Sequence, residues 1–409
     1  MNRVNFPYQT VKDIDLRGKR VLLRADYNVP LKNGKITDDY RIVASLPTVR
    51  YLLEQQAKVV IVSHLGRPKS KDDAEYSLLP VARALAAKLD CTVNFIDDCI
   101  GEKVRQAVKQ QKTGELVLLE NLRFHPEEKA NDSKFAAALA KDTASEVFVQ
   151  DGFGVVHRAD ASTTSITEYL PAVAGLLVER EYLAIKRAMQ APKRPMTAVI
   201  GGAKISDKIA LIKKFIAVAD NVIVGGALAN NFLRHLGYPV GNSLVEDSVE
   251  GIVADVLASA KSKYGDSYEE HFILPRDVAV AETGSLDDPR HEVALSEVKP
   301  GQVIYDLGEK TIDTIDRVIS DSHTVIWNGT LGMAEYQQFA HASARLAMAL
   351  AKNEQVTSII GGGDTADFVR KWDALDGGSF SHVSTGGGAS LSLMAGETLP
   401  GIAALLWRL

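Results

Sequence analysis

Cysteine is scarce in this chain of 409 residues, which has only Cys91 and Cys99. Two thiols in a chain of this length suggest a reducing, cytoplasmic compartment, and they form no zinc-binding pattern. We expect both to be inert small residues. Apolar runs are also short, since none approaches the roughly 20 residues that cross a bilayer. The first residues contain no apolar signal core, so we expect no membrane partner.

An excess of positive charge is absent as well. The chain has 47 Lys and Arg against 52 Asp and Glu, a formal net charge of −5, which argues against nucleic acid as a bulk partner. No Gly-x-x-x-x-Gly-Lys-Ser/Thr run occurs, so the chain is not a P-loop enzyme. Nothing in the sequence demands an oligomer, and we expect a monomer.

Short apolar runs alternate with helical patterns along the whole chain. In the first half, the runs typical of buried strands are Val21–Leu23, Lys58–Ser63, Cys91–Phe95, Leu116–Leu119 and Val147–Gln150. In the second half they are Ala198–Ile200, Asn221–Val224, Phe272–Leu274, Thr324–Trp327, Ser358–Ile360 and Ser381–Ser384. Stretches such as Asp39–Gln56, Leu79–Leu89 and Asp132–Lys141 have apolar residues at helical spacing. This alternation predicts an α/β fold with parallel sheets flanked by helices.

The length of the chain favours two domains over a single core. A helical stretch from Ala172 to Ala191 is followed by the breaker Ala191–Pro195. We therefore expect a first domain over residues 1–171, an interdomain hinge helix over residues 172–191, and a second domain over residues 192–388.

Basic residues gather at the ends of apolar runs in the first half. They are Arg24, Arg41, His64, Arg67, Arg123, His157 and Arg158. Ligands of parallel sheets lie outside the carboxyl ends of the strands, and guanidinium groups bind anions through paired hydrogen bonds. One such arginine is more often a surface residue than a ligand, but several strand-end loops with the same bias predict an anion site.

Asp26 and Asn28 follow Arg24 at alternate positions. Their oxygens can accept hydrogen bonds from hydroxyl groups, which suits a hydroxy acid. A strand-end turn with a local ion pair explains the same residues equally well.

The second half has glycines at the ends of its apolar runs. They are Gly201–Gly202, Gly225–Gly226, Gly361–Gly363 and Gly386–Gly388. Glycine turns that open helices let backbone N–H groups approach phosphates. Lys204 and Lys208, four apart, are expected on one helical face beside a polyphosphate; the alternative is two solvated lysines.

Two further runs suggest nucleotide contacts. Asp364 could hold magnesium, and the Thr365 hydroxyl could hold phosphate oxygens. Residues 361–366 also fit a weak dinucleotide-binding pattern. Glu335 could accept bonds from a ribose, although alone its run is only a loop.

Together these runs resemble the phosphoglycerate kinase family. The shared signatures, in order, are Arg24-x-Asp26-x-Asn28, Ser63-His64-Leu65-Gly66-Arg67-Pro68, Glu120-Asn121-x-Arg123-Phe124, Gly201-Gly202-Ala203-Lys204, Trp327-Asn328-Gly329, Gly361-Gly362-Gly363-Asp364-Thr365 and Ser384–Ser390. The match runs from about Val11 to the end of the sequence, and seven ordered motifs make chance agreement very improbable.

The resemblance implies two Rossmann-like domains, joined by the hinge helix, around a central cleft. The N-terminal domain would bind 3-phosphoglycerate or 1,3-bisphosphoglycerate, and the C-terminal domain Mg-ATP or Mg-ADP. Residues from about 389 to 409 would fold back onto the N-terminal domain. The implied reaction is reversible, Mg²⁺-dependent phosphoryl transfer between ATP and the carboxylate of 3-phosphoglycerate.

The resemblance also implies a role for each matching residue. Those for phosphoglycerate are Asp26, Asn28, Arg41, His64, Arg67, Arg123 and Arg158, and the catalytic residues are Arg41, Lys204 and Lys208. Those for the nucleotide are Lys208, Gly225, Gly226, Asn328, Glu335, Gly362, Gly363, Asp364, Thr365, Gly386 and Gly387. Asp364 would be the metal ligand.

The chemistry agrees with such a site. The attacking carboxylate is already ionised at neutral pH and needs no general base. Catalysis then consists of alignment and charge stabilisation in a loose phosphoryl transition state. Because acceptor and donor would lie in different domains, we expect the hinge to close when both ligands bind.

Some positions depart from the family pattern, and they put nucleotide affinity and base preference in question. They are Gly152, Val155, Val156, Asp160, Glu309, Thr330 and Ala334.

Two other classes of function stay open. An NAD-dependent dehydrogenase is one, although no clear ribose-binding acid lies about 20 residues beyond the pattern at 361–366. A non-catalytic binding or scaffold homologue is the other.

Overall fold

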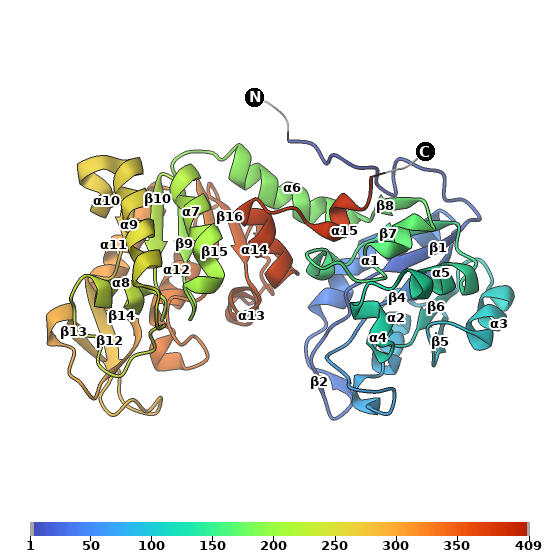
Figure 1. Cartoon of the computed structure of the whole chain (residues 1–409), viewed down its shortest axis with the longest axis horizontal. Helices are drawn as coiled ribbons and strands as arrows, with labels where there is room; N and C mark the ends of the chain where they lie inside the picture. The colour runs from blue at the N-terminus through green and yellow to red at the C-terminus, as the bar shows by residue number, and fades with distance from the viewer. Residues whose placement is uncertain (1–3, 407–409) are drawn as a thin grey trace. The chain divides into compact units, whose positions relative to one another are not determined.

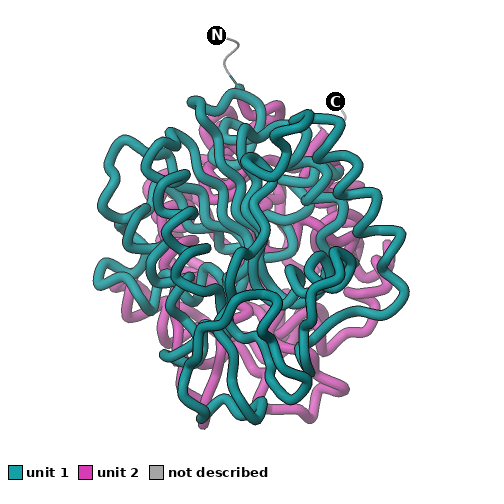
Figure 2. The backbone as a smooth tube through the Cα atoms, turned by 90° about the vertical axis from the view of Figure 1, so that its left-hand side faces the viewer, with its two compact units in different colours: residues 1–4, 184–397 teal, residues 5–183, 398–409 magenta. Residues whose placement is uncertain are grey.

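The computed structural model describes residues 4–406, which divide into two compact units (Figures 1 and 2). The N-terminal unit comprises residues 5–183 and 398–406, and the C-terminal unit comprises Val4 and residues 184–397. The chain leaves the first unit within helix α6 (Leu176–Gln190) and returns to it after Glu397.

The N-terminal unit is built on a six-stranded sheet in the order β5-β6-β4-β1-β7-β8. Its strands are β1 (Arg20–Arg24), β4 (Lys58–Val62), β5 (Val93–Ile96), β6 (Leu116–Leu119), β7 (Val147–Gln150) and β8 (Ala172–Ala174). All neighbouring pairs are parallel. In the centre, Arg24 is in register with Val62 and Gln150. The loops after β1, β4 and β7 therefore start side by side at one edge of the sheet.

Helices and one small hairpin complete this unit. They are α1 (Tyr40–Glu54), α2 (Leu79–Leu89), α3 (Glu102–Gln110), α4 (Pro126–Lys129), α5 (Ser133–Asp142), α15 (Pro400–Ala403) and the hairpin β2 (Leu31–Lys32) with β3 (Lys35–Ile36). Apolar side chains of the strands, such as Leu23 and Ile61, pack in one buried cluster with Ile42 of α1 and Leu85 of α2. The returning segment is tied in by the Gly401 N–H, which donates to the Val156 carbonyl at 2.9 Å.

The C-terminal unit has a second six-stranded parallel sheet, in the order β11-β10-β9-β15-β16-β17. Its strands are β9 (Met196–Ile200), β10 (Asn221–Val224), β11 (Phe272–Ile273), β15 (Thr324–Asn328), β16 (Thr357–Gly361) and β17 (His382–Val383). Asn328 at the end of β15 is in register with Ile200 and Gly361. Three glycine-containing loops thus leave the sheet at neighbouring positions.

Eight helices and a small second sheet belong to the described part of this unit. The helices are α7 (Ile209–Val218), α8 (Ala229–His235), α9 (Glu250–Tyr264), α10 (Tyr268–His271), α11 (Glu309–Asp321), α12 (His341–Lys352), α13 (Gly363–Trp372) and α14 (Gly387–Ala395). The second sheet is antiparallel, with β12 (Asp277–Ala281) between β13 (His291–Ala294) and β14 (Val303–Leu307).

The α/β class with parallel sheets flanked by helices is confirmed. The antiparallel sheet is an addition that the alternating pattern did not predict. The expected helix over residues 172–191 is wrong at its start. Ala172–Ala174 forms β8, because it pairs with β7 in the register Phe148–Ala172, and α6 begins only at Leu176. Across residues 4–406, no helix combines the length and apolar character needed to span a bilayer.

Candidate functional site

Four arginines surround a buried histidine at the strand ends of the N-terminal unit. His64, directly after β4, is 2% exposed. Burial lowers its pKa well below the ordinary value, and the charges of Arg24, Arg123, Arg158 and Arg41 lower it further. The result is a concentrated positive field around a neutral imidazole, which suits a small, highly charged anion.

Asp26 and Asn28 are already engaged within this group. The Arg41 Nη1 atom lies 3.2 Å from Asp26 Oδ2 and donates to the Asn28 carbonyl at 3.0 Å. The Asn28 Oδ1 atom accepts the Gly66 N–H at 2.8 Å. Asp26 is therefore ion-paired with Arg41 of α1 and not with Arg24 of its own run, whose partner is Glu128. Asn28 also fixes the loop that carries Arg67. Arg67 is exposed, whereas the other predicted phosphoglycerate residues are buried or half-buried.

Arg123 and Arg158 come from the loops after β6 and β7. The Arg123 Nη1 atom donates to the Gly66 carbonyl at 2.6 Å, and burial together with the charge of Arg158 lowers its pKa to about 10. The Arg158 Nε atom lies 3.3 Å from His157 Nε2. Asp160 is buried, and its charge opposes the lowering of the Arg123 pKa. This carboxylate therefore offsets part of the positive field.

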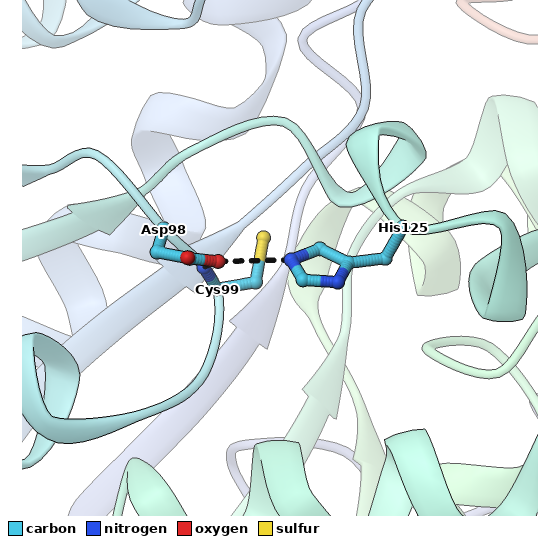
Figure 3. A group of neighbouring side chains, drawn as sticks. All are labelled: Asp98, Cys99 and His125. Atoms are coloured by element: carbon cyan, nitrogen blue, oxygen red, sulfur yellow. Dashed lines mark hydrogen bonds and ion pairs between the residues drawn. The ribbon is translucent and has the colours of Figure 1, made fainter. Parts of the chain in front are cut away.

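The loops after β5 and β6 are joined by a polar cluster of Asp98, Cys99 and His125 (Figure 3). The His125 Nε2 atom lies 2.9 Å from Asp98 Oδ1, and Lys71 Nζ lies 3.0 Å from Asp98 Oδ2. The Cys99 thiol donates to the Glu120 carbonyl at 2.9 Å. Burial raises the pKa of this thiol well above its usual value, so it is a poor nucleophile. The cluster holds in place the loop that carries Arg123.

Lys208 is a half-buried cation of the C-terminal unit. Its ammonium donates to the Gly201 carbonyl at 2.6 Å and to Asn328 Oδ1 at 3.1 Å. Burial lowers its pKa to about 8, and Asp364 opposes that shift. Lys208 therefore lies against the glycine turn after β9 with its charge weakly compensated.

Lys204 does not share a helical face with Lys208, so that expectation is wrong. Lys204 is exposed in a loop, Ser206–Lys208 forms a single 3₁₀ turn, and α7 begins at Ile209. The Glu246 carboxylate accepts the Ser206 N–H at 3.1 Å, which stabilises this loop in place of a longer helix.

The glycine pairs at 201–202 and 225–226 allow the turns after β9 and β10 to pack closely through their backbones. The Gly226 N–H donates to the Leu331 carbonyl at 2.9 Å. A Cβ atom at Gly226 would lie 2.6 Å from the Gly202 nitrogen, and Gly202 itself has φ +102°. Larger residues would push these loops apart. Gly225 follows β10 directly, and its N–H donates to the Ile200 carbonyl.

The other two glycine runs, at 361–363 and 386–388, place two helix N-termini next to each other. Helix α13 begins at Gly363 and α14 at Gly387, and a Cβ atom at Gly387 would lie 2.8 Å from the Gly363 nitrogen. Gly362 and Gly386 immediately precede the two helices. Two neighbouring helix N-termini form a favourable place for phosphate oxygens.

The Thr365 hydroxyl has a structural partner. Thr365 is fully buried, and its Oγ1 atom accepts the Gly329 N–H at 2.7 Å. It thus fixes the loop after β15 to helix α13. Next to it, the buried Asn328 Nδ2 atom has no hydrogen-bond partner within the described residues.

A cavity of about 480 Å³ lies beside these turns, a size that suits a small ligand. Predicted residues at its wall are Gly226, Glu335 and Asp364. Wall residues that the sequence did not reveal include Asn230, Asn242, Leu244, Tyr305 and Asp306. Two of these, Tyr305 and Asp306, come from β14 of the antiparallel sheet, which no sequence pattern indicated.

Two of the positions that depart from the family pattern, Thr330 and Glu309, have identifiable surroundings in the structure. Thr330 lines the cavity. Glu309 is the first residue of α11, and its carboxylate accepts from Arg345 of α12 at 2.9 Å. An acid there is favoured by the helix dipole and joins two helices.

Comparison with known proteins identifies close relatives. A family model described as phosphoglycerate kinase matches residues 11–397. A phosphoglycerate kinase of Pelotomaculum thermopropionicum is 45% identical over 398 residues, covering 97% of this chain and 99% of that protein. That of Aquifex aeolicus is 44% identical over 394 residues, covering 96% of each chain.

Solved structures agree with these matches. Phosphoglycerate kinase from Coxiella burnetii matches with a TM-score of 0.84 and 37% identity, covering 98% of this chain and 99% of that one. The enzyme from Pyrococcus horikoshii matches with a TM-score of 0.79 and 31% identity, covering 97% and 98%. The dehydrogenase and scaffold alternatives receive no support.

Proposed function

Since the chain belongs to the phosphoglycerate kinase family, we propose that its N-terminal unit binds 3-phosphoglycerate and its C-terminal unit binds Mg-ATP or Mg-ADP. The family's reaction transfers a phosphoryl group between ATP and the carboxylate of 3-phosphoglycerate. The basic group around His64 supports the first assignment, because its four arginines match a substrate that carries a phosphate and a carboxylate. The cavity beside the glycine turns supports the second.

Asp364 fits the role of metal ligand in this proposal. It is exposed in the first turn of α13 and lies on the cavity wall. Mg²⁺ prefers oxygen ligands and is usually held by one or two carboxylates together with substrate phosphates. When bound, the ion would neutralise charge on the phosphates.

The remaining roles follow from the contacts. Backbone N–H groups of Gly363 and Gly387 would bind phosphate oxygens, and the unpartnered Asn328 Nδ2 atom would donate to the same group. Gly362 and Gly386, whose N–H groups donate to Ser390 Oγ and Ser384 Oγ, would shape the two turns of this nucleotide site. Thr365 would act by holding Gly329 in place. Glu335 would accept from the ribose, and Gly226 would line the same cavity. Gly225, directly before Gly226, would shape this nucleotide-binding turn.

Catalysis in this arrangement needs no proton acceptor, because the attacking carboxylate is ionised. Arg41, Lys204 and Lys208 would stabilise the charge on the phosphoryl group in transit. We also propose that the enzyme works as a cytoplasmic monomer.

A coupled assay tests the proposal. Glyceraldehyde-3-phosphate dehydrogenase reports 1,3-bisphosphoglycerate made from 3-phosphoglycerate and Mg-ATP as consumption of NADH. We expect turnover by the wild-type chain and its loss in Asp364→Ala. Asp367→Ala, which removes a more distal acid of the same helix, is the matched control. Absence of turnover in a folded wild-type protein would reject the proposed reaction.

A further inference from the structure

A buried chain of polar side chains runs behind His64. Arg24 and Ser162 are fully buried, as is Glu128. The Arg24 Nε atom donates to Ser162 Oγ at 2.7 Å, and Ser162 Oγ donates to Glu128 Oε1 at 2.5 Å. The Glu128 carboxylate also lies 3.8 Å from Arg24 Nη2. The charge of this arginine is therefore compensated, and its orientation is fixed from behind.

The other end of the guanidinium meets the imidazole. Arg24 Nη2 lies 3.3 Å from His64 Nδ1. A guanidinium only donates hydrogen bonds, so Nδ1 must be the acceptor and the ring proton must reside on Nε2. Asp26 Oδ1 also approaches Nδ1, but at 4.0 Å, and the Asp26 carboxylate is held by Arg41 at 3.2 Å. The arginine contact therefore decides the tautomer.

A second proton on this ring is strongly disfavoured. The charged groups that face His64 are Arg24 from β1, Asp26 after β1, Arg41 from α1, and two arginines from the loops after β6 and β7, Arg123 and Arg158. Burial and the four cations oppose the imidazolium, while Asp26 near the ring, Glu128 behind Arg24 and Asp160 near Arg123 offset only part of the positive charge.

The proton on Nε2 has no acceptor of its own. The Nε2 atom is buried and has no hydrogen-bond partner among residues 4–406. Leaving a buried donor unsatisfied is unfavourable, so binding of an anionic oxygen that accepts from Nε2 stabilises the site.

We propose that Arg24 is a positioning residue, which with Ser162 and Glu128 holds His64 as a neutral imidazole whose Nε2–H donates to the anionic substrate. This inference rests on the proposed function for the identity of that substrate, 3-phosphoglycerate. His64 then contributes a directed hydrogen bond, and the arginines contribute the charge. It follows that protonation of His64 contributes nothing to the pH dependence of 3-phosphoglycerate affinity.

The tautomer is directly measurable. We would record long-range ¹H–¹⁵N spectra of the full-length protein with ¹⁵N-labelled histidine, between pH 8 and pH 5, and assign His64 with His64→Gln. We expect one protonated nitrogen, Nε2, and a bare Nδ1 throughout that range. Protonation at Nδ1, or a doubly protonated ring above pH 5, would overturn the inference.

A variant that loosens Arg24 adds a second readout. Ser162→Ala removes the Arg24 Nε partner and should give His64 a mixture of tautomers, with KM for 3-phosphoglycerate raised roughly 2–10-fold by loss of one directed hydrogen bond and kcat little changed. Ser165→Ala, in the same segment but bonded to Asn131, should leave the spectrum unchanged. An unchanged His64 spectrum in Ser162→Ala would refute the part that the proposal gives to Ser162 in holding Arg24.

The two proposals fail separately. A wild-type spectrum with Nε2 protonated that does not respond to 3-phosphoglycerate would reject the assigned binding site while supporting the role of Arg24. A spectrum with Nδ1 protonated in an active enzyme would reject the role of Arg24 while supporting the proposed function.

Discussion

Gly152 and Val155 are a matched pair at the loop after β7. A Cβ atom at position 152 would lie 3.1 Å from Val155 Cγ2 and 3.2 Å from the Ala25 carbonyl carbon. The first contact is with the side chain of Val155. Two of the positions that depart from the family pattern thus constrain each other sterically, in the loop that leads to His157 and Arg158.

A double-mutant cycle measures this steric coupling. Gly152→Ala should destabilise the chain by about 1–2 kcal/mol, because an extra methyl group crowds a packed site. The same change in a Val155→Ala background should cost at least about 0.5 kcal/mol less. Urea unfolding of the four proteins gives the coupling free energy, and strictly additive effects would contradict the pairing.

Lys208 should give the reaction an alkaline limit. Its pKa is lowered to about 8 by burial, so the free enzyme loses this positive charge as the pH rises through that value. We expect kcat/KM for Mg-ATP to fall above pH 8, since kcat/KM reports groups of the free enzyme.

Two variants check the assignment of that limit to Lys208. Lys208→Arg should shift the alkaline decline to higher pH, because a guanidinium keeps its charge. Lys204→Met, which alters the exposed lysine, should lower activity without changing the pH profile. A wild-type profile that is flat to pH 9.5 would rule out Lys208 as the titrating group.

Arg41 and Arg67 should differ in kinetic effect. Arg41 approaches Asp26 and the Asn28 carbonyl deep in the basic group, whereas Arg67 is exposed. We expect Arg41→Ala mainly to lower kcat, by loss of charge stabilisation in the transition state, and Arg67→Ala mainly to raise KM for 3-phosphoglycerate. Steady-state kinetics would count against this division if the pattern were reversed.

At the scale of elements, two aspartates link strand ends to helix N-termini. Asp151, after β7, accepts the Leu177 N–H of α6 at 2.9 Å, and Asp306, in β14, accepts the Ala342 N–H of α12 at 3.2 Å. Burial raises the pKa of each to about 7. Both helices therefore begin at a carboxyl group that is costly to ionise.

This cost makes stability depend on pH. Between pH 4 and pH 7 the folded chain retains a proton on Asp151 that the unfolded chain has lost, so stability decreases as the pH rises through this range. Asp151→Asn keeps the acceptor and removes the titration. Urea midpoints at pH 5 and pH 8 should differ less in this variant than in wild type, by an amount corresponding to roughly 1–3 kcal/mol. Asp132→Asn, at the cap of α5, is the control and should match wild type.

The central parallel strands were predictable because they are apolar runs with a partner strand on both sides. Residues 172–174 were not, since three small residues form a strand only when β7 is there to pair with them. The antiparallel sheet was missed for a related reason. His291–Ala294 is half-exposed and has no apolar run to mark it.

The residues of the candidate site also fall into two groups, those that the sequence identified and those that it did not. Motif residues such as His64, Arg123 and Asp364 were identifiable because they follow apolar runs. Ser162 and Glu128 were not identifiable, since their function depends on contacts with Arg24, which lies more than one hundred positions away. The hydrogen bond from the Gly329 N–H to the Thr365 hydroxyl is likewise evident only from the structure.

At the scale of the whole molecule, the proposed split of the substrates between the two units carries a prediction about motion. Transfer requires reacting atoms about 3–3.5 Å apart, so binding of both substrates must bring their units together. Small-angle scattering should show a smaller radius of gyration with 3-phosphoglycerate and a non-hydrolysable ATP analogue together than with either alone. Identical curves in all three states would exclude closure.

The return of the chain to its first unit has a consequence for biosynthesis. Residues 398–406 belong with the N-terminal unit, and Gly401 bonds to Val156, next to His157 and Arg158. On the ribosome, the N-terminal unit must wait for this segment until nearly the entire described chain has been translated. A nascent or stalled product that ends before residue 398 would lack this support beside its basic loop, so completion of the anion site is coupled to translation of residues 398–406.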